Sequence, residues 1–194
     1  MNATTGPKLA APGAGLPAPE FFVARALFAL KCRTGSRDAF IAGFREERAK
    51  IRALVDSCPP ARRGDRVLIR RLRGMEDSSR HWSVWMTLDH LRIVNGGIAA
   101  VIGELGRGRV PEMQVGTADV KPDPAVTAAV EDEYERSCDG FLDQVGKVAD
   151  LKAGPRHPHP WFGPLDGFRW LAIASIHMGI HRAQLAAIIR GLNP

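Results

Sequence analysis

The chain has 194 residues, of which 45% are hydrophobic and 25% are charged, so it is long enough to form one domain with a substantial core. Its formal net charge of +6 does not by itself indicate a nucleic-acid partner, because the placement of charges matters more than their sum. The three cysteines are far apart and form no Cys-x-x-Cys pair, which argues against a disulfide framework or a cysteine metal site and fits a reducing, cytoplasmic setting.

The N-terminal segment, residues 1–20, is rich in Ala, Pro and Gly, and we expect it to be a disordered arm ahead of a single domain over residues 21–194. The apolar run from Phe21 to Leu30 is interrupted by Arg25 and is too short to span a bilayer, so it predicts a short helix or extended segment lying on the domain. No other segment approaches a transmembrane length, and we expect no membrane partner.

The first long helix is predicted over residues 36–57, with Ser36 as N-cap and Pro59 just beyond its end. Its apolar positions fall on one stripe, namely Phe40, Phe44, Ile51 and Val55. Six arginines follow between Arg62 and Arg73, in a stretch without an aromatic residue that could stack on a base. A solvated surface loop therefore accounts for them better than a nucleic-acid site.

The second helix is predicted over residues 79–105, with His81 near its start and facing solvent. One face carries a series of residues three or four apart, namely Met86, His90, Val94, Gly97, Val101 and Leu105. The interior glycines Gly96 and Gly97 indicate either a close helix approach or a local bend, because glycine weakens a helix by about 1 kcal/mol relative to Ala.

The third helix is predicted over residues 123–150, beginning at Asp123 and Pro124, and the fourth over residues 165–192. The fourth is apolar on nearly all sides and should be the most buried. A loop of roughly eighteen residues joins the second and third helices, long enough to cross the bundle. The fold class is therefore all-α, a four-helix bundle with a long crossover between its second and third helices.

Three of the six histidines lie on predicted helices in a pattern that suits a metal ion. His177 and His181 are four residues apart and share one helix face, and His90 lies on the core stripe of the second helix. Neutral imidazole is a ligand for zinc, nickel, copper and ferrous iron. Three such ligands from two helices would leave coordination positions open, as in catalytic sites. The alternative for each ring is an ordinary hydrogen-bonded core histidine.

Two segments resemble the DinB-like superfamily. The first is Trp82-Ser-Val-Trp-Met-Thr-Leu-Asp-His90-Leu, which is similar to the second helix of that family. The second runs from His159-Pro-Trp-Phe-Gly-Pro-Leu-Asp166 through Trp170-Leu to His177-Met-Gly-Ile-His181-Arg-Ala-Gln184-Leu, which resembles its last helix. The resemblance as a whole spans about residues 36–192 in the family's order.

The resemblance implies a four-helix bundle, often dimeric, in which one histidine of the second helix and two of the fourth hold a divalent metal. Those positions fall on His90, His177 and His181, and zinc or nickel suits them. Relatives include thiol transferases and isomerases that use low-molecular-weight thiols. The expected partners are thus a small-molecule substrate, such as a thiol, and a second copy of the chain, with no nucleic acid.

Residues beside the three histidines have two readings each. Gln184 either lines the pocket or holds a metal-bound water, with a polar residue at the bundle mouth as the alternative. Trp170 either walls the cavity or packs in the core. Asp89 is a weak candidate to orient an imidazole, because adjacent residues on a helix face differently. Gly179 would admit a neighbouring helix closely. Arg182 points off the ligand face, toward an interface or an anionic substrate group.

The segment Arg156-His-Pro-His-Pro-Trp161 precedes the fourth helix. Its prolines keep it extended, so His157 and His159 are expected to be exposed rings of a rigid loop, with a fourth ligand as the alternative.

Three functions follow for comparison. The first is a metal-dependent enzyme, either a thiol S-transferase or a small-molecule hydrolase, and the absence of an evident general base near the ligands favours thiol transfer. The second is a metal-binding or stress-related protein without turnover. The third, DNA binding, is disfavoured because no helix-turn-helix or basic helix is visible.

Overall fold

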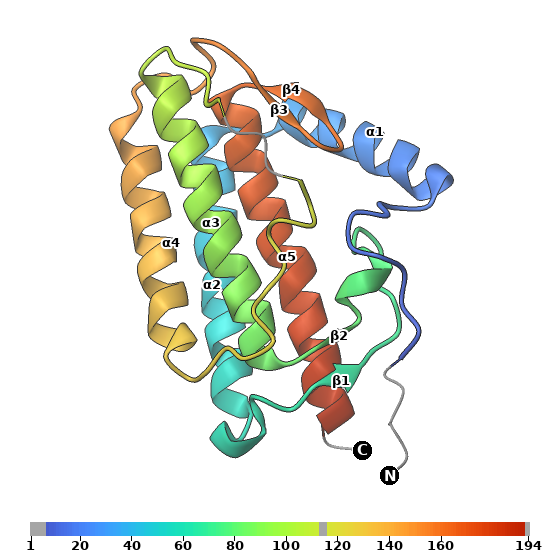
Figure 1. Cartoon of the computed structure of the whole chain (residues 1–194). Helices are drawn as coiled ribbons and strands as arrows, with labels where there is room; N and C mark the ends of the chain where they lie inside the picture. Colours follow the sequence, from blue (N-terminus) through green and yellow to red (C-terminus); the bar gives the residue numbers. More distant parts are fainter. Residues whose placement is uncertain (1–6, 113–115, 193–194) are drawn as a thin grey trace.

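The computed structural model describes residues 7–112 and 116–192, and four long helices, α2 to α5, pack side by side as a bundle (Figure 1). The helices are α1 Ala18–Thr34, α2 Arg37–Ser57, α3 Val84–Gly106, α4 Val130–Lys147 and α5 Gly167–Leu192. The strands are β1 Val67–Leu68, β2 His81–Trp82, β3 His157–His159 and β4 Gly163–Leu165. The all-α, four-helix-bundle prediction is confirmed.

The short strands are a feature that the sequence analysis did not anticipate. β1 pairs antiparallel with β2, and β3 with β4, in ladders of two and three residues. Strands this short cannot show the alternation by which longer ones are recognised. The first pair takes His81 out of the second helix, which begins at Val84 instead of residue 79, with the Ser83 hydroxyl accepting a hydrogen bond from the Met86 N–H at 3.1 Å.

The first bundle helix agrees with its prediction, and the third does not. Ser36 caps α2 by accepting a hydrogen bond from the Ala39 N–H at 3.1 Å. Asp123, predicted to cap the third helix, instead accepts from the N–H of Ala125, two residues on, and closes only a local turn. α4 begins at Val130, where three consecutive acidic residues occupy the first turn and favour the positive end of the helix dipole.

α3 and α4 run in the same direction, and residues 116–129 of the connection between them lie along the outside of the bundle (Figure 1). Its described part lies close to α3 and α5, which brings Val120 against His90. This connection therefore contributes directly to the environment of the predicted ligands.

The N-terminal segment differs from the expected disordered arm over its described residues. Residues 1–6 of that prediction lie outside the described residues. Beyond them, the Ala10 N–H donates to Asp77 at 2.8 Å, and the N–H groups of Gly13 and Gly15 donate to Glu76 at 3.3 Å each. α1 projects sideways from the end of the bundle where β3 and β4 lie (Figure 1), with Phe28 packed on Phe162 at a ring distance of 4.5 Å.

The interior glycines of α3 do not mark a close helix approach. Gly96 and Gly97 are exposed, and a Cβ added at either would meet no atom within 4 Å. Gly179 on α5 is similar, since an added Cβ would meet only the Glu47 carboxylate at an ordinary 3.7 Å. Of the two alternatives given for Gly96 and Gly97, a close helix approach is therefore not found, and Gly179 makes only ordinary contact with α2.

α5 is the central helix of the fold. Its length and mean hydropathy of 1.2 are those of a helix that could cross a membrane, which the sequence analysis did not expect of any segment. In this structure it packs against α2 and α3, with Leu171, Met178, Leu185 and Ile188 fully buried. Those packed faces account for its apolar composition as a core helix.

The packing of the core predicts that alanine substitutions of two phenylalanines will differ strongly in their effect on stability. Phe44 is fully buried and stacks on Phe141 across α2 and α4 at 4.5 Å, whereas Phe22 on α1 is 69% exposed. Phe44→Ala should lower the free energy of unfolding by about 3–5 kcal/mol, because it leaves a cavity. Phe22→Ala should change it by less than about 0.5 kcal/mol. Urea unfolding followed by circular dichroism measures both, and equal losses would contradict the described packing.

Candidate metal centre

The structure brings the three predicted histidines together inside the bundle. His90 comes from α3, and His177 and His181 come from consecutive turns of α5. Their ring centroids are 5.0 Å apart for His90 and His177, 4.5 Å for His90 and His181, and 4.3 Å for His177 and His181. One nitrogen from each ring lies within 4.8 Å of the others. The rings therefore form one compact cluster of potential ligands.

Two of these rings have their protonation set by a hydrogen bond to an oxygen. His90 Nδ1 lies 2.6 Å from the Val120 carbonyl, and His181 Nδ1 lies 2.6 Å from Gln184 Oε1. The Gln184 amide is oriented in turn by donating from Nε2 to the Ser79 carbonyl at 2.7 Å. Because these oxygens only accept, each Nδ1 carries the proton and each Nε2 keeps a free lone pair.

The spacing of the free nitrogens fits a shared metal ion. His90 Nε2 and His177 Nε2 are 3.1 Å apart. Two nitrogens bound at about 2.0–2.1 Å to one ion, at an angle of about 90–110°, would be separated by about 2.9–3.4 Å. His177 Nδ1 is buried without a hydrogen-bond partner among the described residues. The donor set is therefore three imidazoles in the neutral form that binds zinc or nickel.

Burial keeps these imidazoles neutral. It lowers the pKa of His90 to about 4, and the hydrogen bond to Val120 opposes this only in part. Burial also holds the pKa values of His177 and His181 well below the ordinary value, with the neighbouring imidazoles adding to the effect. Since a proton and a metal ion compete for the same lone pair, the lowered pKa values leave the nitrogens available at neutral pH.

The walls of the cluster are aromatic. Trp82 lies 5.1 Å from the His90 ring and stacks on His181 at 6.1 Å with an interplanar angle of 9°. Among the described residues, no carboxylate belongs to the group of possible ligands. Asp89, weighed as an orienting partner, instead accepts from Arg92 at 2.6 Å and from the Asp123 N–H at 2.9 Å. It does not orient a ligand.

The other sequence candidates have mixed outcomes. Gln184 is fully buried and orients His181, a closer role than either reading assigned to it. Trp170 is buried, and its ring contacts are with His157 at 5.9 Å and His159 at 5.1 Å. Arg182 pairs with Glu47 on α2 at 2.5 Å, so its guanidinium is held by a helix–helix contact.

The rings of His157 and His159 are not exposed as expected. The segment forms β3, and its pairing with β4 folds the two rings onto Trp170. His157 is only 3% exposed, and burial lowers the pKa of His159 to about 4. Neither belongs to the compact ligand group, so the alternative of a fourth ligand is not supported.

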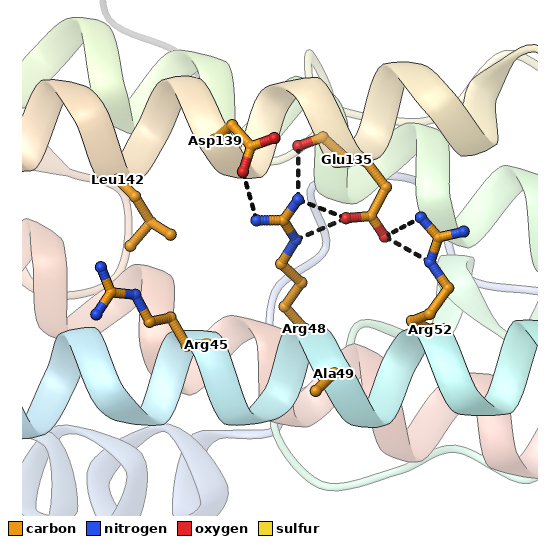
Figure 2. A pocket seen from close by; sticks show the side chains of 7 residues that line it. All are labelled: Arg45, Arg48, Ala49, Arg52, Glu135, Asp139 and Leu142. Carbon is orange, nitrogen blue, oxygen red and sulfur yellow. Dashed lines mark hydrogen bonds and ion pairs between the residues drawn. The ribbon is translucent and has the colours of Figure 1, made fainter.

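A separate hollow lies between α2 and α4, away from the histidines (Figure 2). Figure 2 shows that its charged side chains pair with one another: Arg48 binds Glu135 and Asp139, each at 2.6 Å, and Arg52 binds Glu135 at 2.9 Å. This network joins two helices at the surface, where each pair contributes little to stability.

The lowered histidine pKa values predict acid sensitivity of the metal-free protein. Unfolded histidines protonate near pH 6.5, whereas the buried rings stay neutral to about pH 4 in the case of His90 and His159. Between these values the unfolded chain binds more protons, so stability falls as pH falls. At pH 5 each such histidine should cost about 2 kcal/mol relative to pH 7.5.

Urea unfolding across this pH range measures the slope. His159→Phe, which removes one titrating ring next to Phe162 and Trp170, should reduce the slope by about one proton per molecule. A stability that stays level from pH 7.5 to 5 would contradict the neutral, buried state of these rings.

Comparisons with known proteins support the fold and identify no function. No family model matches the chain, and no curated protein matches it. Among solved structures, the chain is similar to that described as "Crystal structure of TT2238, a four-helix bundle protein", with 23% sequence identity and a TM-score of 0.58, over 78% of this chain and 99% of that one. This likeness shows that the chain has a four-helix-bundle fold.

Proposed function

We propose that this chain binds one divalent metal ion, zinc or nickel, through His90, His177 and His181. The observation that carries the proposal is the meeting of three neutral imidazoles from two helices, with two of their Nε2 atoms 3.1 Å apart. Without an ion, one of these two Nε2 atoms must carry a proton to make the contact between them favourable, whereas an ion between them would accept both lone pairs.

The charge of the site bears on the chemistry. Three neutral ligands leave the full charge of a divalent ion uncompensated, and no carboxylate of the described residues belongs to the group. A dication in such surroundings favours an anionic fourth ligand. Bound there, zinc or nickel acts as a Lewis acid that lowers the pKa of a coordinated thiol or water.

We propose, on this basis and on the sequence resemblance, that the chain is a DinB-like metal-dependent enzyme acting on a small molecule. A thiol S-transferase is favoured over a hydrolase, because a thiolate attacks an electrophile without a separate general base, and no carboxylate stands beside the triad to serve as one. The proposal extends to a homodimer, as the resemblance implies.

A non-catalytic metal-binding protein is the second candidate, and the burial of two of the three ligands favours it. His90 and His181 are only 6% and 5% exposed, and Trp82 covers both rings. Restricted access suits a sensor or scaffold that holds its ion. Only the enzyme would convert a substrate to a product, so a measurement of metal-dependent turnover distinguishes the two functions.

Metal content tests the site. Wild-type protein should bind about one ion per chain, and His181→Ala should weaken binding at least about 100-fold, because one of three ligands is lost. The matched control is His81→Ala, which removes a histidine of β2 that lies outside the ligand group. Mass-spectrometric metal analysis and competition with a chelator give both values. Unchanged binding in the His181 variant would overturn the assignment.

A thiol panel tests the activity. Metal-loaded protein, incubated with low-molecular-weight thiols and an electrophile, should form the thioether product at a rate that falls to background on chelation and in His181→Ala. The His81→Ala variant should keep its rate. Metal binding without product for any thiol, and without hydrolysis of ester or amide probes, would favour the non-catalytic alternative.

A further inference from the structure

A buried carboxylate outside the triad joins three distant parts of the chain. Glu76 precedes β2 and is only 5% exposed. It accepts hydrogen bonds from five groups, namely the N–H of Gly13 and of Gly15, the hydroxyls of Ser78 and Thr117, and Lys121 Nζ, at distances from 2.8 to 3.3 Å. Gly13 and Gly15 have φ of +86° and +76°, a backbone conformation that other residues rarely adopt. A side chain at either position would therefore strain the conformation in which these N–H groups point at the carboxylate.

Lys121 is the cationic partner in this cluster. Its Nζ lies 2.9 Å from Glu76 and also donates to the Ser78 and Ser79 hydroxyls at 2.9 and 3.0 Å. It sits 5.5 Å above the Trp82 ring, which packs on the triad. Burial tends to raise the pKa of Glu76, but the hydrogen bonds from Lys121 and Thr117 outweigh it and hold that pKa below its usual value. The Glu76 carboxylate is therefore ionised, and it accepts five hydrogen bonds.

The two segments that this pair clamps are the ones that orient the ligands. The residue before Lys121 is Val120, whose carbonyl accepts from His90 Nδ1 at 2.6 Å. Ser79, bound to Lys121 through its hydroxyl, offers its carbonyl to Gln184, and Gln184 accepts from His181. Each contact is too short to tolerate a shift of about 1 Å in either segment.

We infer that the Glu76–Lys121 ion pair is a positioning device for the imidazoles of His90 and His181, acting through the Val120 and Ser79 carbonyls. A buried ion pair adds little net stability. It does hold the two segments in one arrangement, because separating or removing either partner would leave an unpaired buried charge. The inference rests on the proposed function only in that the oriented rings are taken to bind a metal.

The first experiment measures the orientation without any metal. In metal-free wild-type protein, the Nδ1 protons of His90 and His181 should be visible by NMR and exchange slowly, because each is hydrogen-bonded and buried. Lys121→Met and Glu76→Gln should accelerate that exchange at least about tenfold. Lys121→Arg, which keeps the charge, should stay within about threefold of wild type.

The matched control is Arg63→Met. Arg63 forms a similarly half-buried ion pair with Glu131 at 2.7 Å and ties another connecting segment to α4, but its hydrogen bonds are to Cys58 and Glu131. It should lose stability as Lys121→Met does and keep slow imidazole exchange. Slow exchange in Lys121→Met, or equally fast exchange in the control, would overturn the inference.

The second experiment measures metal affinity and the spectrum of the cobalt-substituted protein. Lys121→Met should bind cobalt about 10–100-fold more weakly and show shifted visible bands, as expected when outer partners of a ligand are lost, while Arg63→Met should match wild type. If wild-type protein binds no cobalt, the proposed function fails and the exchange rates still decide the inference. If wild type and Lys121→Met bind cobalt alike, with the same spectrum, the positioning role is refuted.

Discussion

Three imidazole rings meet where α3 packs on α5, two of them on buried residues and the third, His177, on a partly buried one. Nitrogens shielded from water in this way need polar partners. Helical spacing places His177 and His181 on one face, and the packing of α3 on α5 adds His90. The Val120 carbonyl and the Gln184 side-chain amide accept from the Nδ1 atoms of His90 and His181, whereas His177 Nδ1 has no hydrogen-bond partner among the described residues. The lone pairs of the ring nitrogens that face one another, such as the Nε2 atoms of His90 and His177, form a stable arrangement when an ion lies between them.

Segments outside the four helices supply hydrogen-bond acceptors and an aromatic wall to the three histidines. The connection between α3 and α4 supplies Val120, the segment before β2 supplies Ser79, and β2 supplies the Trp82 ring. The position of both segments depends in part on polar contacts such as the ion pair of Glu76 and Lys121. The irregular parts of the chain thus determine the geometry of the site as much as the helices do.

The excess of basic residues has a structural explanation in part. In the arginine-rich connection after α2, Arg62 pairs with Asp65, Arg63 with Glu131 and Arg71 with Glu20. Two of these pairs attach the connection to α4 and to α1. Guanidinium groups engaged in this way fasten segments together, which agrees with a structural surface loop.

The sequence by itself determined the bundle and the identity of the three histidines, because both follow from local periodicity: apolar residues three or four apart define the helix faces, and ligands four apart share one. It could not locate the start of α4, because Asp123 closes a turn as readily as it caps a helix. Nor could it find Val120, Ser79 or the Glu76–Lys121 pair, whose partners lie 30 or more residues away. Only the tertiary structure decided those contacts. Every residue has a backbone carbonyl, so the sequence does not mark which one accepts a hydrogen bond, and the partner depends on which segments the fold brings together.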